Sequence, residues 1–476
     1  MRTIDVAPLP LSELESHLDE VASHRLNGGI EAARVLLEGR TVWTVTPSAA
    51  AGSGPAETVA PLVGYALGLG IDVRWLALDA PADFVRVAAR LHAGIHGDRG
   101  DGGKLGEKQR DLYEHVLASN AENVTEDVRE GDVVILHDPP TAGLARSLKR
   151  AGLTVIWRCH LGGGPSGVAA ERAWAFLDRY LEDVDLVIVS REEYRPAFIE
   201  PERCVVVAPS VNPDSPKNRV LDLDEAWSVA RLAGIYDGEP PFEAVPFVHE
   251  DGRPDAIRSM PSLAGAGLPV PTGVRTIAQV GRWDRLKGAE ELIEAFATNL
   301  TALPGDAHLL IVGPEPDPNR DEAAAAYLGE VLDRWDLLPE SVSRRVHIAA
   351  VPTYDREVNA TVVNAVQRVA DVVTQRSRVE AFGLPVAEAM WKKAAVVASA
   401  VGGIQDQIVN GIDGVLVDPA DASTWAQAVA DLLRLPQRAR EMGLAAHESV
   451  RREFLPDRHL RETAGAIDRA LELHAD

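Results

Sequence analysis

Several ingredients of common protein classes are scarce in this chain of 476 residues. It has two cysteines, Cys159 and Cys204, too few for a disulfide framework or a cysteine-rich zinc site. No uninterrupted apolar run approaches the roughly 20 residues that a membrane helix needs. The N-terminal stretch has early acidic residues and no apolar core, unlike a secretory signal. We therefore expect a cytoplasmic protein that does not insert into a membrane.

Positive charge is also in short supply. The chain has 48 Lys and Arg residues against 72 Asp and Glu residues, a formal net charge of −24. Such a surface repels nucleic acid and anionic lipid, so we expect neither as a partner, whereas a small anionic substrate fits where basic side chains gather locally. A hydrophobic content of 46% and a charged content of 25% are typical of globular proteins, and the length predicts two or three domains.

The first 212 residues predict an N-terminal domain that is Rossmann-like. Residues 1–40 predict a helical preface, because apolar side chains recur at three- and four-residue steps. A strand, a glycine-rich loop, a helix and a second strand then follow between residues 41 and 78, which is the βαβ unit of a parallel sheet. Apolar, β-branched runs predict further strands, covered on both faces, at 132–138, 153–160, 186–190 and 204–210.

The rest of the chain predicts a connector and a second domain. Proline and glycine recur in residues 213–272, which predicts a connector. Strand and helix patterns alternate again in 273–455, and a C-terminal helix over 456–476 could pack back on the N-terminal domain. The predicted fold class is α/β, with two Rossmann-like, doubly wound parallel sheets facing across a cleft. Such sheets bind ligands outside the carboxyl ends of their strands.

Two cations lie where the first strand of the second domain passes into a helix. Arg282 and Lys287 belong to the loop in VGRWDRLKG. Helix N–H groups and two positive side chains can hold a diphosphate there. Ordinary solvated surface charges are the alternative interpretation of this loop taken alone.

Two glutamates flank a turn in the segment RVEAFGLPVAEAMWKKAAVVAS. Glu380 precedes the turn, and Glu388 lies within a helix predicted to begin at Pro385, where proline suits a first helical turn. The apolar surroundings predict a buried turn rather than a solvated helix face. The backbone N–H groups expected to favour an anion at the helix start belong to Phe382, Gly383 and Leu384.

Together these segments resemble the retaining glycosyltransferases of the GT-B fold, the group that contains sucrose-phosphate and glycogen synthases. The resemblance implies that Arg282 and Lys287 bind the diphosphate of the sugar donor. It implies that Glu380 contacts hydroxyls of the donor sugar and that Glu388 contacts the ribose of the nucleotide. The backbone amides between the two glutamates would cover the diphosphate.

Segments of the first domain resemble one family within this group more closely. The segments DVVILHDPP, VIWRCH and APSVNPDSPKN are similar to trehalose synthases of the glycosyltransferring type and to the related trehalose phosphorylases, and the likeness spans residues 40–455. It implies that His160 sits beside the donor sugar at the anomeric centre, and that His137 and Asp138 lie near the acceptor glucose. From the pattern alone, a core histidine is the alternative for His160.

Two loops depart from that family's pattern. After the WRCH motif this chain has residues 161–166, LGGGPS, where the family continues into an Ile-Asp stretch. In the first loop Ser53 separates Gly52 from Gly54, where the family has an unbroken glycine run. Since we expect both loops to lie near a sugar, the identity of the acceptor stays open.

The predicted activity is retaining transfer of a glucosyl group from a nucleoside-diphosphate glucose (UDP, ADP or GDP) to a sugar acceptor, with glucose as the acceptor that gives trehalose. Retaining glycoside hydrolases use a second carboxylate as the nucleophile, and no carboxylate of this chain is obviously placed for that role. We therefore expect the leaving group and the acceptor to lie on the same face of the sugar. Arg282 and Lys287 supply charge for the phosphates, so no cofactor and no essential metal is expected, and a divalent ion would at most stimulate. His92 and His96 lack a third metal ligand.

Other interpretations stay open at this point. A phosphorylase using inorganic phosphate would share the basic pocket but would need no ribose contact from Glu388. A non-catalytic sugar-nucleotide-binding protein is a second alternative. A dehydrogenase is disfavoured, because no GxGxxG turn follows the first strand of either domain. The sequence is compatible with either a monomer or a homodimer.

Overall fold

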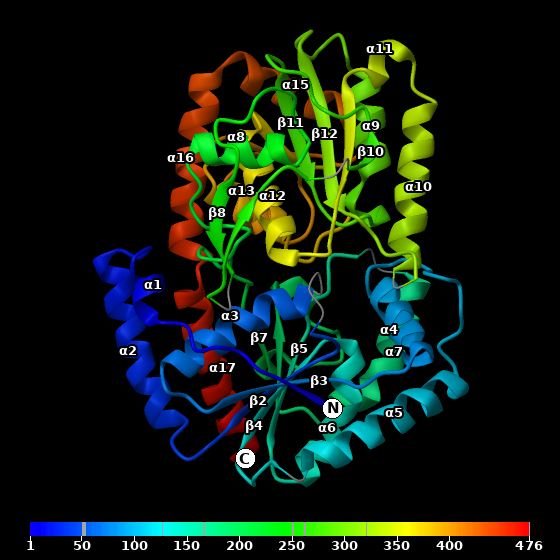
Figure 1. Cartoon of the computed structure of the whole chain (residues 1–476). Coiled ribbons are helices and arrows are strands. Elements are labelled where there is room, and N and C mark those ends of the chain that lie inside the picture. Colours follow the sequence, from blue (N-terminus) through cyan, green and yellow to red (C-terminus); the bar gives the residue numbers. More distant parts are fainter. Residues whose placement is uncertain are drawn as a thin grey trace. The chain divides into compact units, whose positions relative to one another are not determined.

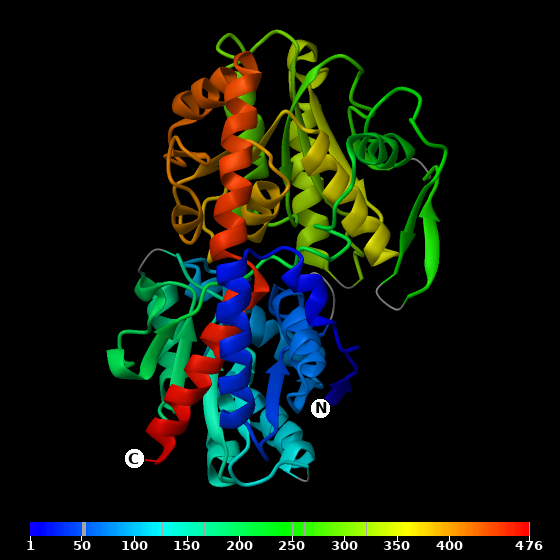
Figure 2. The same ribbon diagram turned by 90° about the vertical axis from the view of Figure 1, so that its left-hand side faces the viewer.

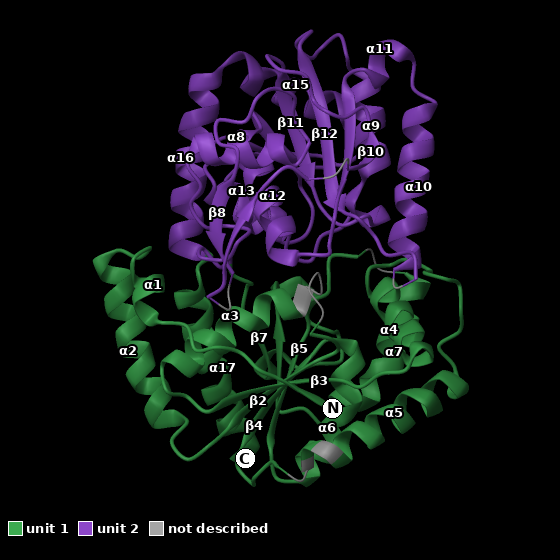
Figure 3. Cartoon of the chain, in the orientation of Figure 1, with its two compact units in different colours: residues 1–210, 454–476 green, residues 211–453 purple. Residues whose placement is uncertain are grey.

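The chain divides into two α/β units, residues 1–210 together with 454–476 (unit 1) and residues 211–453 (unit 2) (Figure 3). The structure is a computed structural model (Figure 1). It describes residues 1–49, 54–125, 127–164, 167–249, 252–260, 263–319 and 321–475.

Unit 1 is built on a seven-stranded sheet with the strand order β1-β3-β2-β4-β5-β6-β7. The strands are β1 (Arg2–Ile4), β2 (Val42–Thr46), β3 (Val73–Ala77), β4 (Val133–His137), β5 (Thr154–Arg158), β6 (Leu186–Val189) and β7 (Cys204–Val206). Strands β2 to β7 are parallel, whereas β1 runs antiparallel to β3 at the edge. The helical preface predicted for residues 1–40 is present as α1 (Leu11–Glu15) and α2 (Glu20–Leu36). It is corrected at its start, because the first residues add an edge strand to the sheet.

The helices of unit 1 form layers around this sheet. They are α1 (Leu11–Glu15), α2 (Glu20–Leu36), α3 (Gly54–Gly68), α4 (Ala82–Ile95), α5 (Glu107–Thr125), α6 (Ala145–Arg150), α7 (Val168–Leu181) and α17 (Pro456–Ala475), with short 3₁₀ turns at Pro139–Leu144, Glu192–Tyr194 and Pro201–Arg203. The C-terminal helix α17 contacts α2, α3, β5 and β6 (Figure 2). Its Ile467 and Ala470 are buried against Val133 and Ile156 of the sheet, so the last segment of the chain completes the core of unit 1.

Unit 2 has a seven-stranded sheet with the order β10-β13-β12-β11-β14-β15-β16. The strands are β10 (Ala264–Ala266), β11 (Arg275–Val280), β12 (Ala307–Pro314), β13 (Val346–Val351), β14 (Val372–Gln375), β15 (Val396–Ser399) and β16 (Val415–Val417). All are parallel except the edge strand β10. Ile277 faces one helical layer and Ala278 the other, since side chains alternate along a strand. Both faces are buried, which explains the apolar runs.

Helices cover both faces of this sheet. They are α8 (Leu223–Leu232), α9 (Ala289–Thr298), α10 (Glu322–Asp336), α11 (Glu340–Ser343), α12 (Arg356–Val369), α13 (Leu384–Trp391), α14 (Ile404–Gln407), α15 (Ala422–Arg434) and α16 (Pro436–Glu453), with a 3₁₀ turn at Arg285–Lys287. One apolar cluster joins the sheet to α9, α10 and α15, and another joins it to α8 and α12.

The segment 213–272, predicted as a connector, is corrected by the structure. It belongs to unit 2 and supplies α8, the two-stranded hairpin of β8 (Val245–Val248) and β9 (Pro254–Ile257), and the edge strand β10. Val229 and Ala230 of α8 are fully buried against α12. The high proline and glycine content hid these elements from the sequence prediction, because the elements are short and are separated by turns rich in these two residues.

Each sheet has one point where the strand order reverses. In unit 2 it lies between β11 and β14, and in unit 1 between β2 and β4. At such a switch point the connections leave to opposite faces of the sheet, so the carboxyl ends of the two strands border a crevice suited to a ligand. The turns after β11 and β14 therefore border the expected crevice of unit 2, and the turns after β2 and β4 border that of unit 1.

Two helical glycines of unit 2 allow a test of how tightly α16 packs beside α13. A Cβ added at Gly443 in α16 would lie 2.0 Å from the carbonyl oxygen of Lys393, just after α13. Gly443→Ala should lower the free energy of unfolding by about 1–3 kcal/mol through overpacking. Gly329→Ala in α10 is the matched control, because nothing lies within 4 Å of its added Cβ. It should raise stability by about 0.5–1 kcal/mol. Denaturant unfolding measures both, and equal effects would contradict the close packing.

Candidate active site

The switch point of unit 2 brings together residues from two turns far apart in the sequence. Lys287 ends the 3₁₀ turn after β11, and Glu380 follows β14. Nζ of Lys287 lies 2.5 Å from Oε1 of Glu380, and the Ser377 hydroxyl donates a hydrogen bond of 2.8 Å to the same oxygen. The two charged side chains are 14% and 6% exposed. The structure thus contains a nearly buried ion pair where the topology predicts a ligand crevice.

Arg282 stands apart from this pair. It lies in the same turn after β11, but its side chain is 55% exposed. Its guanidinium is 3.9 Å from the carboxylate of Asp284, which itself accepts a hydrogen bond from the backbone N–H of Leu286. Arg282 therefore presents an accessible cation in the turn that also carries Lys287.

Gln279 holds the two turns together, a residue that the sequence prediction missed. Its side chain is buried within β11 and donates to the carbonyl oxygen of Lys287 at 3.0 Å, while accepting from the backbone N–H of Arg376 at 2.8 Å. A further backbone hydrogen bond runs from Arg378 to Leu286. The single amide inside the apolar run RTIAQV was the available signal.

The turn between the two glutamates leads directly into α13. Gly383 is the residue before the helix and has φ of +92°, Leu384 is the first helical residue, and Phe382 is buried. The amide of Gln407 donates to the carbonyl oxygen of Phe382 at 2.6 Å. The helix begins one residue before the predicted Pro385, and the turn that leads into it is held by a side chain from α14.

Glu388 occupies a different place from Glu380. It is buried in α13, and Nζ of Lys217 lies 3.7 Å from its Oε1. One turn later, Lys392 donates to the side chains of Asn218 and Gln367 at 2.7 and 2.9 Å. Burial lowers the pKa of Lys392, although the Glu388 carboxylate opposes the shift. Neither lysine was singled out in the sequence; both tie α13 to its surroundings.

In unit 1, Asp138 follows β4 in a strained backbone conformation. Its φ is 63° and its ψ 169°, a region that essentially only glycine adopts freely. The conformation is held by hydrogen bonds from its N–H to the carbonyl of Arg158 and from the Trp157 indole to its own carbonyl. Its carboxylate accepts a hydrogen bond of 2.7 Å from the backbone N–H of His160. Burial raises the pKa of Asp138 to about 7, against the effects of that N–H and of Arg158.

His137 and His160 lie beside each other at the same edge. Nδ1 of His137 is 2.8 Å from Nε2 of His160, with the two rings stacked, and Nε2 of His137 is 3.1 Å from the Thr44 hydroxyl. Burial, reinforced by the charge of Arg158, lowers the pKa of His137 to about 3 and that of His160 well below its ordinary value. Both are therefore neutral imidazoles at pH 7. The structure brings His137, Asp138 and His160 together, as predicted for this edge of the sheet.

These histidines border a cavity of about 120 Å³ under α2, α3 and α17. Its walls are mainly apolar, but Arg158 and His459 also line it. His459, on α17, accepts or donates a hydrogen bond of 2.9 Å with Ser210. Arg158 donates to the carbonyl of Val207 at 3.1 Å. The sequence prediction missed both residues. Arg158 was noted only as part of the motif VIWRCH, and the expected packing of the C-terminal helix on the N-terminal domain did not show which of its side chains would reach this cavity.

The glycine stretch after His160 packs against neighbouring segments. A Cβ at Gly162 would lie 2.4 Å from the ring of Tyr194, and a Cβ at Gly164 would lie 2.3 Å from the backbone of His96. The glycines therefore allow close approach of the backbone. Gly54 begins α3, whereas Gly52 and residues 165–166 lie outside the described residues. His92 and His96 contact each other edge to face.

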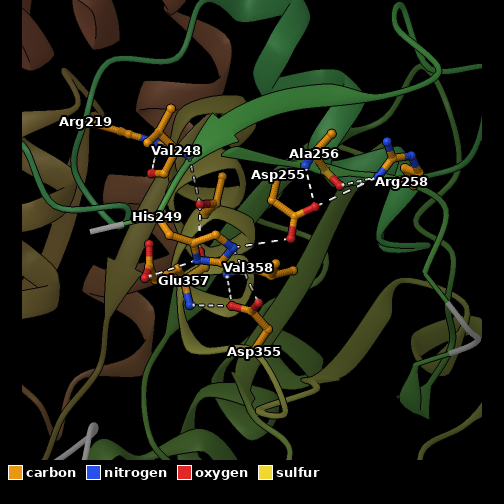
Figure 4. A network of polar contacts seen from close by, with 10 residues as sticks. Arg219, Val248, His249, Asp255, Ala256, Arg258, Asp355, Glu357 and Val358 are labelled. Atoms are coloured by element: carbon orange, nitrogen blue, oxygen red, sulfur yellow. Dashed lines mark hydrogen bonds and ion pairs between the residues drawn. The ribbon is translucent and has the colours of Figure 1, made fainter. Parts of the chain in front are cut away.

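A polar network also joins the β8–β9 hairpin to the start of α12 (Figure 4). His249 lies 3.3 Å from a carboxylate oxygen of Asp255 through Nε2 and 3.2 Å from one of Glu357 through Nδ1. Asp355 caps α12 by accepting two backbone N–H groups. Within the described ranges, His249, Asp255 and Asp355 are the group with metal-ligand spacing. A metal ion held by Nε2 of His249 and the two aspartates would replace the contact of Nε2 with Asp255, whereas the contact of Nδ1 with Glu357 could remain.

Comparison with known proteins identifies the family. A model described as the N-terminal domain of trehalose synthase matches residues 45–196, and a model of group 1 glycosyl transferases matches residues 266–449. The trehalose synthase of Pyrococcus horikoshii is 31% identical over 425 residues, which cover 89% of this chain and 88% of that protein. This chain belongs to the trehalose synthase family. The Rubrobacter xylanophilus trehalose synthase is 30% identical and covers 94% of the chain and 92% of its own length.

Solved structures show that this member of the trehalose synthase family has the GT-B fold. Sucrose-phosphate synthase from Thermosynechococcus elongatus matches with a TM-score of 0.62 at 21% identity, covering 91% of this chain and 99% of that one. A trehalose-phosphate synthase (UDP-forming) from Burkholderia vietnamiensis matches with a TM-score of 0.66 at 16% identity, covering 90% and 98%. The predicted fold class is confirmed in both sheets. The similarity to the trehalose synthases over most of their length shows that the chain is a hexosyltransferase. In the parts described, no helix is long and apolar enough to cross a bilayer.

The strained backbone at Asp138 gives a testable difference between two substitutions. Asp138→Gly and Asp138→Ala both remove the carboxylate that accepts the His160 N–H. Only glycine adopts the observed φ and ψ without strain, so the glycine variant should be more stable than the alanine variant by about 1–3 kcal/mol. Denaturant unfolding of the two proteins measures the difference. Equal stability would show that the conformation carries no strain.

Proposed function

We propose that this trehalose synthase family member transfers a glucosyl group, with retention, from a nucleoside-diphosphate glucose to glucose, giving trehalose. The Lys287–Glu380 pair at the switch point of unit 2 carries the proposal. An E. coli protein with the same fold has been solved bound with UDP-2-fluoro glucose, which supports a nucleotide-sugar donor here.

In this proposal, the turn after β11 receives the donor diphosphate. Arg282 offers an accessible guanidinium. Lys287 offers an ammonium group, which forms an ion pair with Glu380. The backbone N–H groups of Phe382, Gly383 and Leu384 at the start of α13 add partial positive charge. These groups stabilise the charge that develops on the leaving diphosphate. They do so without an essential metal ion, because the two side chains supply the positive charge.

The sugar groups would be recognised by acceptors and neutral donors. Glu380 would accept hydrogen bonds from donor-sugar hydroxyls, and Glu388 from the ribose. Asp138 would accept a hydrogen bond from the acceptor glucose, and His160 would contact the donor sugar near its anomeric carbon. The bond from that carbon to the phosphate oxygen breaks as the acceptor oxygen bonds on the same face. The acceptor proton passes to the departing phosphate oxygen.

Two substitutions in unit 2 test the roles of the donor side chains. Glu380→Gln keeps the size of the side chain, and Arg282→Ala removes an exposed group without leaving a buried charge unpaired. Each should lower kcat/KM for transfer by about 10²–10³-fold with native circular dichroism. Arg378→Ala is the matched control, because this arginine is 59% exposed in the neighbouring turn and pairs with Glu291. Near-normal activity in Glu380→Gln or Arg282→Ala would contradict the assignment.

Ligand-induced thermal shifts separate the transferase from a trehalose phosphorylase-type reaction. UDP, ADP or GDP at about 100 times its Kd should stabilise the protein by about 2.7 kcal/mol, and inorganic phosphate should do much less. Glu388→Gln should reduce the nucleotide shift, since the proposed ribose contact is lost. Stabilisation by phosphate but by none of the three nucleotides would instead favour the phosphorylase.

A further inference from the structure

Three polar side chains of unit 1, Thr44, His137 and His160, form a hydrogen-bonded chain that ends at His160. The Thr44 hydroxyl lies 3.1 Å from Nε2 of His137, and Nδ1 of His137 lies 2.8 Å from Nε2 of His160. Thr44 and His137 are 5% and 4% exposed. All three side chains line the cavity of about 120 Å³ described above. They connect the strands β2, β4 and the turn after β5.

The direction of these hydrogen bonds follows from the needs of the Thr44 hydroxyl. Among the described residues its one hydrogen-bond partner is Nε2 of His137. A buried donor that finds no acceptor costs more than an acceptor that is only partly used. The hydroxyl therefore donates to Nε2 of His137. A neutral imidazole has a single N–H, so His137 carries its proton on Nδ1.

The same reasoning passes to His160. Nδ1–H of His137 donates to Nε2 of His160, which must therefore be the unprotonated nitrogen. Both rings are neutral, because burial and the nearby charge of Arg158 lower the pKa of each. His160 then carries its single proton on Nδ1. In the described part of the chain, Nδ1 of His160 has no hydrogen-bond partner, so this N–H remains for a ligand.

We infer that Thr44 and His137 are positioning residues that fix His160 as the Nδ1–H tautomer, a neutral hydrogen-bond donor toward an oxygen of the bound sugar. This assignment of the tautomer's use rests on the role proposed above for His160. Without the Thr44 hydroxyl, His137 could carry its proton on Nε2, and His160 could then reverse its own tautomer and present an acceptor.

A second histidine pair in unit 2 provides an internal reference. Nδ1 of His308 lies 2.8 Å from Nε2 of His347, with the rings stacked, and Nδ1 of His347 lies 2.5 Å from the carbonyl oxygen of Gly267. A carbonyl can only accept, so Nδ1 of His347 carries the proton. This pair lies at the starts of β12 and β13, away from the carboxyl ends of the strands.

Nitrogen NMR of the full-length protein with ¹⁵N-labelled histidine reads the tautomers directly. Protonated and unprotonated nitrogens of a neutral imidazole resonate far apart, and His347 calibrates the Nδ1–H form. The wild type should show His160 protonated on Nδ1. Thr44→Val should shift His160 toward the Nε2–H form, whereas Thr44→Ser, which keeps the hydroxyl, should restore the wild-type signals. His160 protonated on Nε2 in the wild type, or unchanged in Thr44→Val, would overturn the inference.

Kinetics of the same proteins test whether the tautomer matters for transfer. Thr44→Val should lower kcat/KM by up to about tenfold, the effect of one neutral hydrogen bond, and Thr44→Ser should retain activity. His137→Asn places an amide N–H near the position of Nδ1 and should retain more activity than His137→Leu. His308→Asn is the control for disturbing a stacked pair, and it should leave transfer unchanged.

The two readouts distinguish failure of this inference from failure of the proposed function. A reversed tautomer in Thr44→Val together with full transfer would overturn the role of His160 in the reaction, while supporting the assignment of the tautomer. Lost transfer in Thr44→Val with an unchanged tautomer would overturn the positioning role of Thr44 and His137. A loss in His308→Asn as large as in Thr44→Val would overturn it too, because the effect would then not be specific to the pair at His160.

Discussion

The reversal of strand order between β11 and β14 is the constraint on which the arrangement of the candidate site in unit 2 depends. It separates two turns at the carboxyl edge of one sheet, and the buried amide of Gln279 then holds them at a fixed spacing. Only with that spacing can Lys287 meet Glu380 at 2.5 Å. A nearly buried ion pair is a poor device for stability, because removing both charges from water offsets most of their attraction. Its presence at a switch point is better explained by a ligand that exchanges partners with it.

The polar residues at the carboxyl edge of the unit 1 sheet differ from the ion pair of unit 2, because most of them are neutral. The polar edge of unit 1 holds His137 and His160 as uncharged imidazoles and Asp138 as a carboxyl with a raised pKa. Neutral donors and a single weak acid suit sugar hydroxyls, whereas the cations of unit 2 suit phosphate. The two units therefore have different electrostatic characters although both are built on doubly wound sheets. That division agrees with a hexosyltransferase, whose substrates carry both kinds of group.

Much of the fold could be predicted because its strands are covered on both faces. Runs such as VVILH and HLLIVG lack polar alternation, and the structure buries them in parallel sheets. The elements that escaped prediction are short: β1 pairs three residues, and β10 is a three-residue edge strand. In the site, Lys287 and Glu380 could be assigned to one ligand because each lies in a segment that resembles the same family, although their direct contact was not predicted. Gln279 and Thr44 could not, because a single polar side chain in an apolar strand does not reveal which distant loop it contacts.

Arg158 links the fold of unit 1 to the protonation of its site. Arg158 is 4% exposed, and burial lowers the pKa of its guanidinium only to about 10, so it remains charged. Its positive charge disfavours protonation of His137 and His160 and favours the ionised form of Asp138. One buried cation, donating to the carbonyl of Val207, therefore biases all three groups at once. Because Arg158 lies within β5 rather than in a loop, this bias is part of the fold itself, which is what a preorganised site requires.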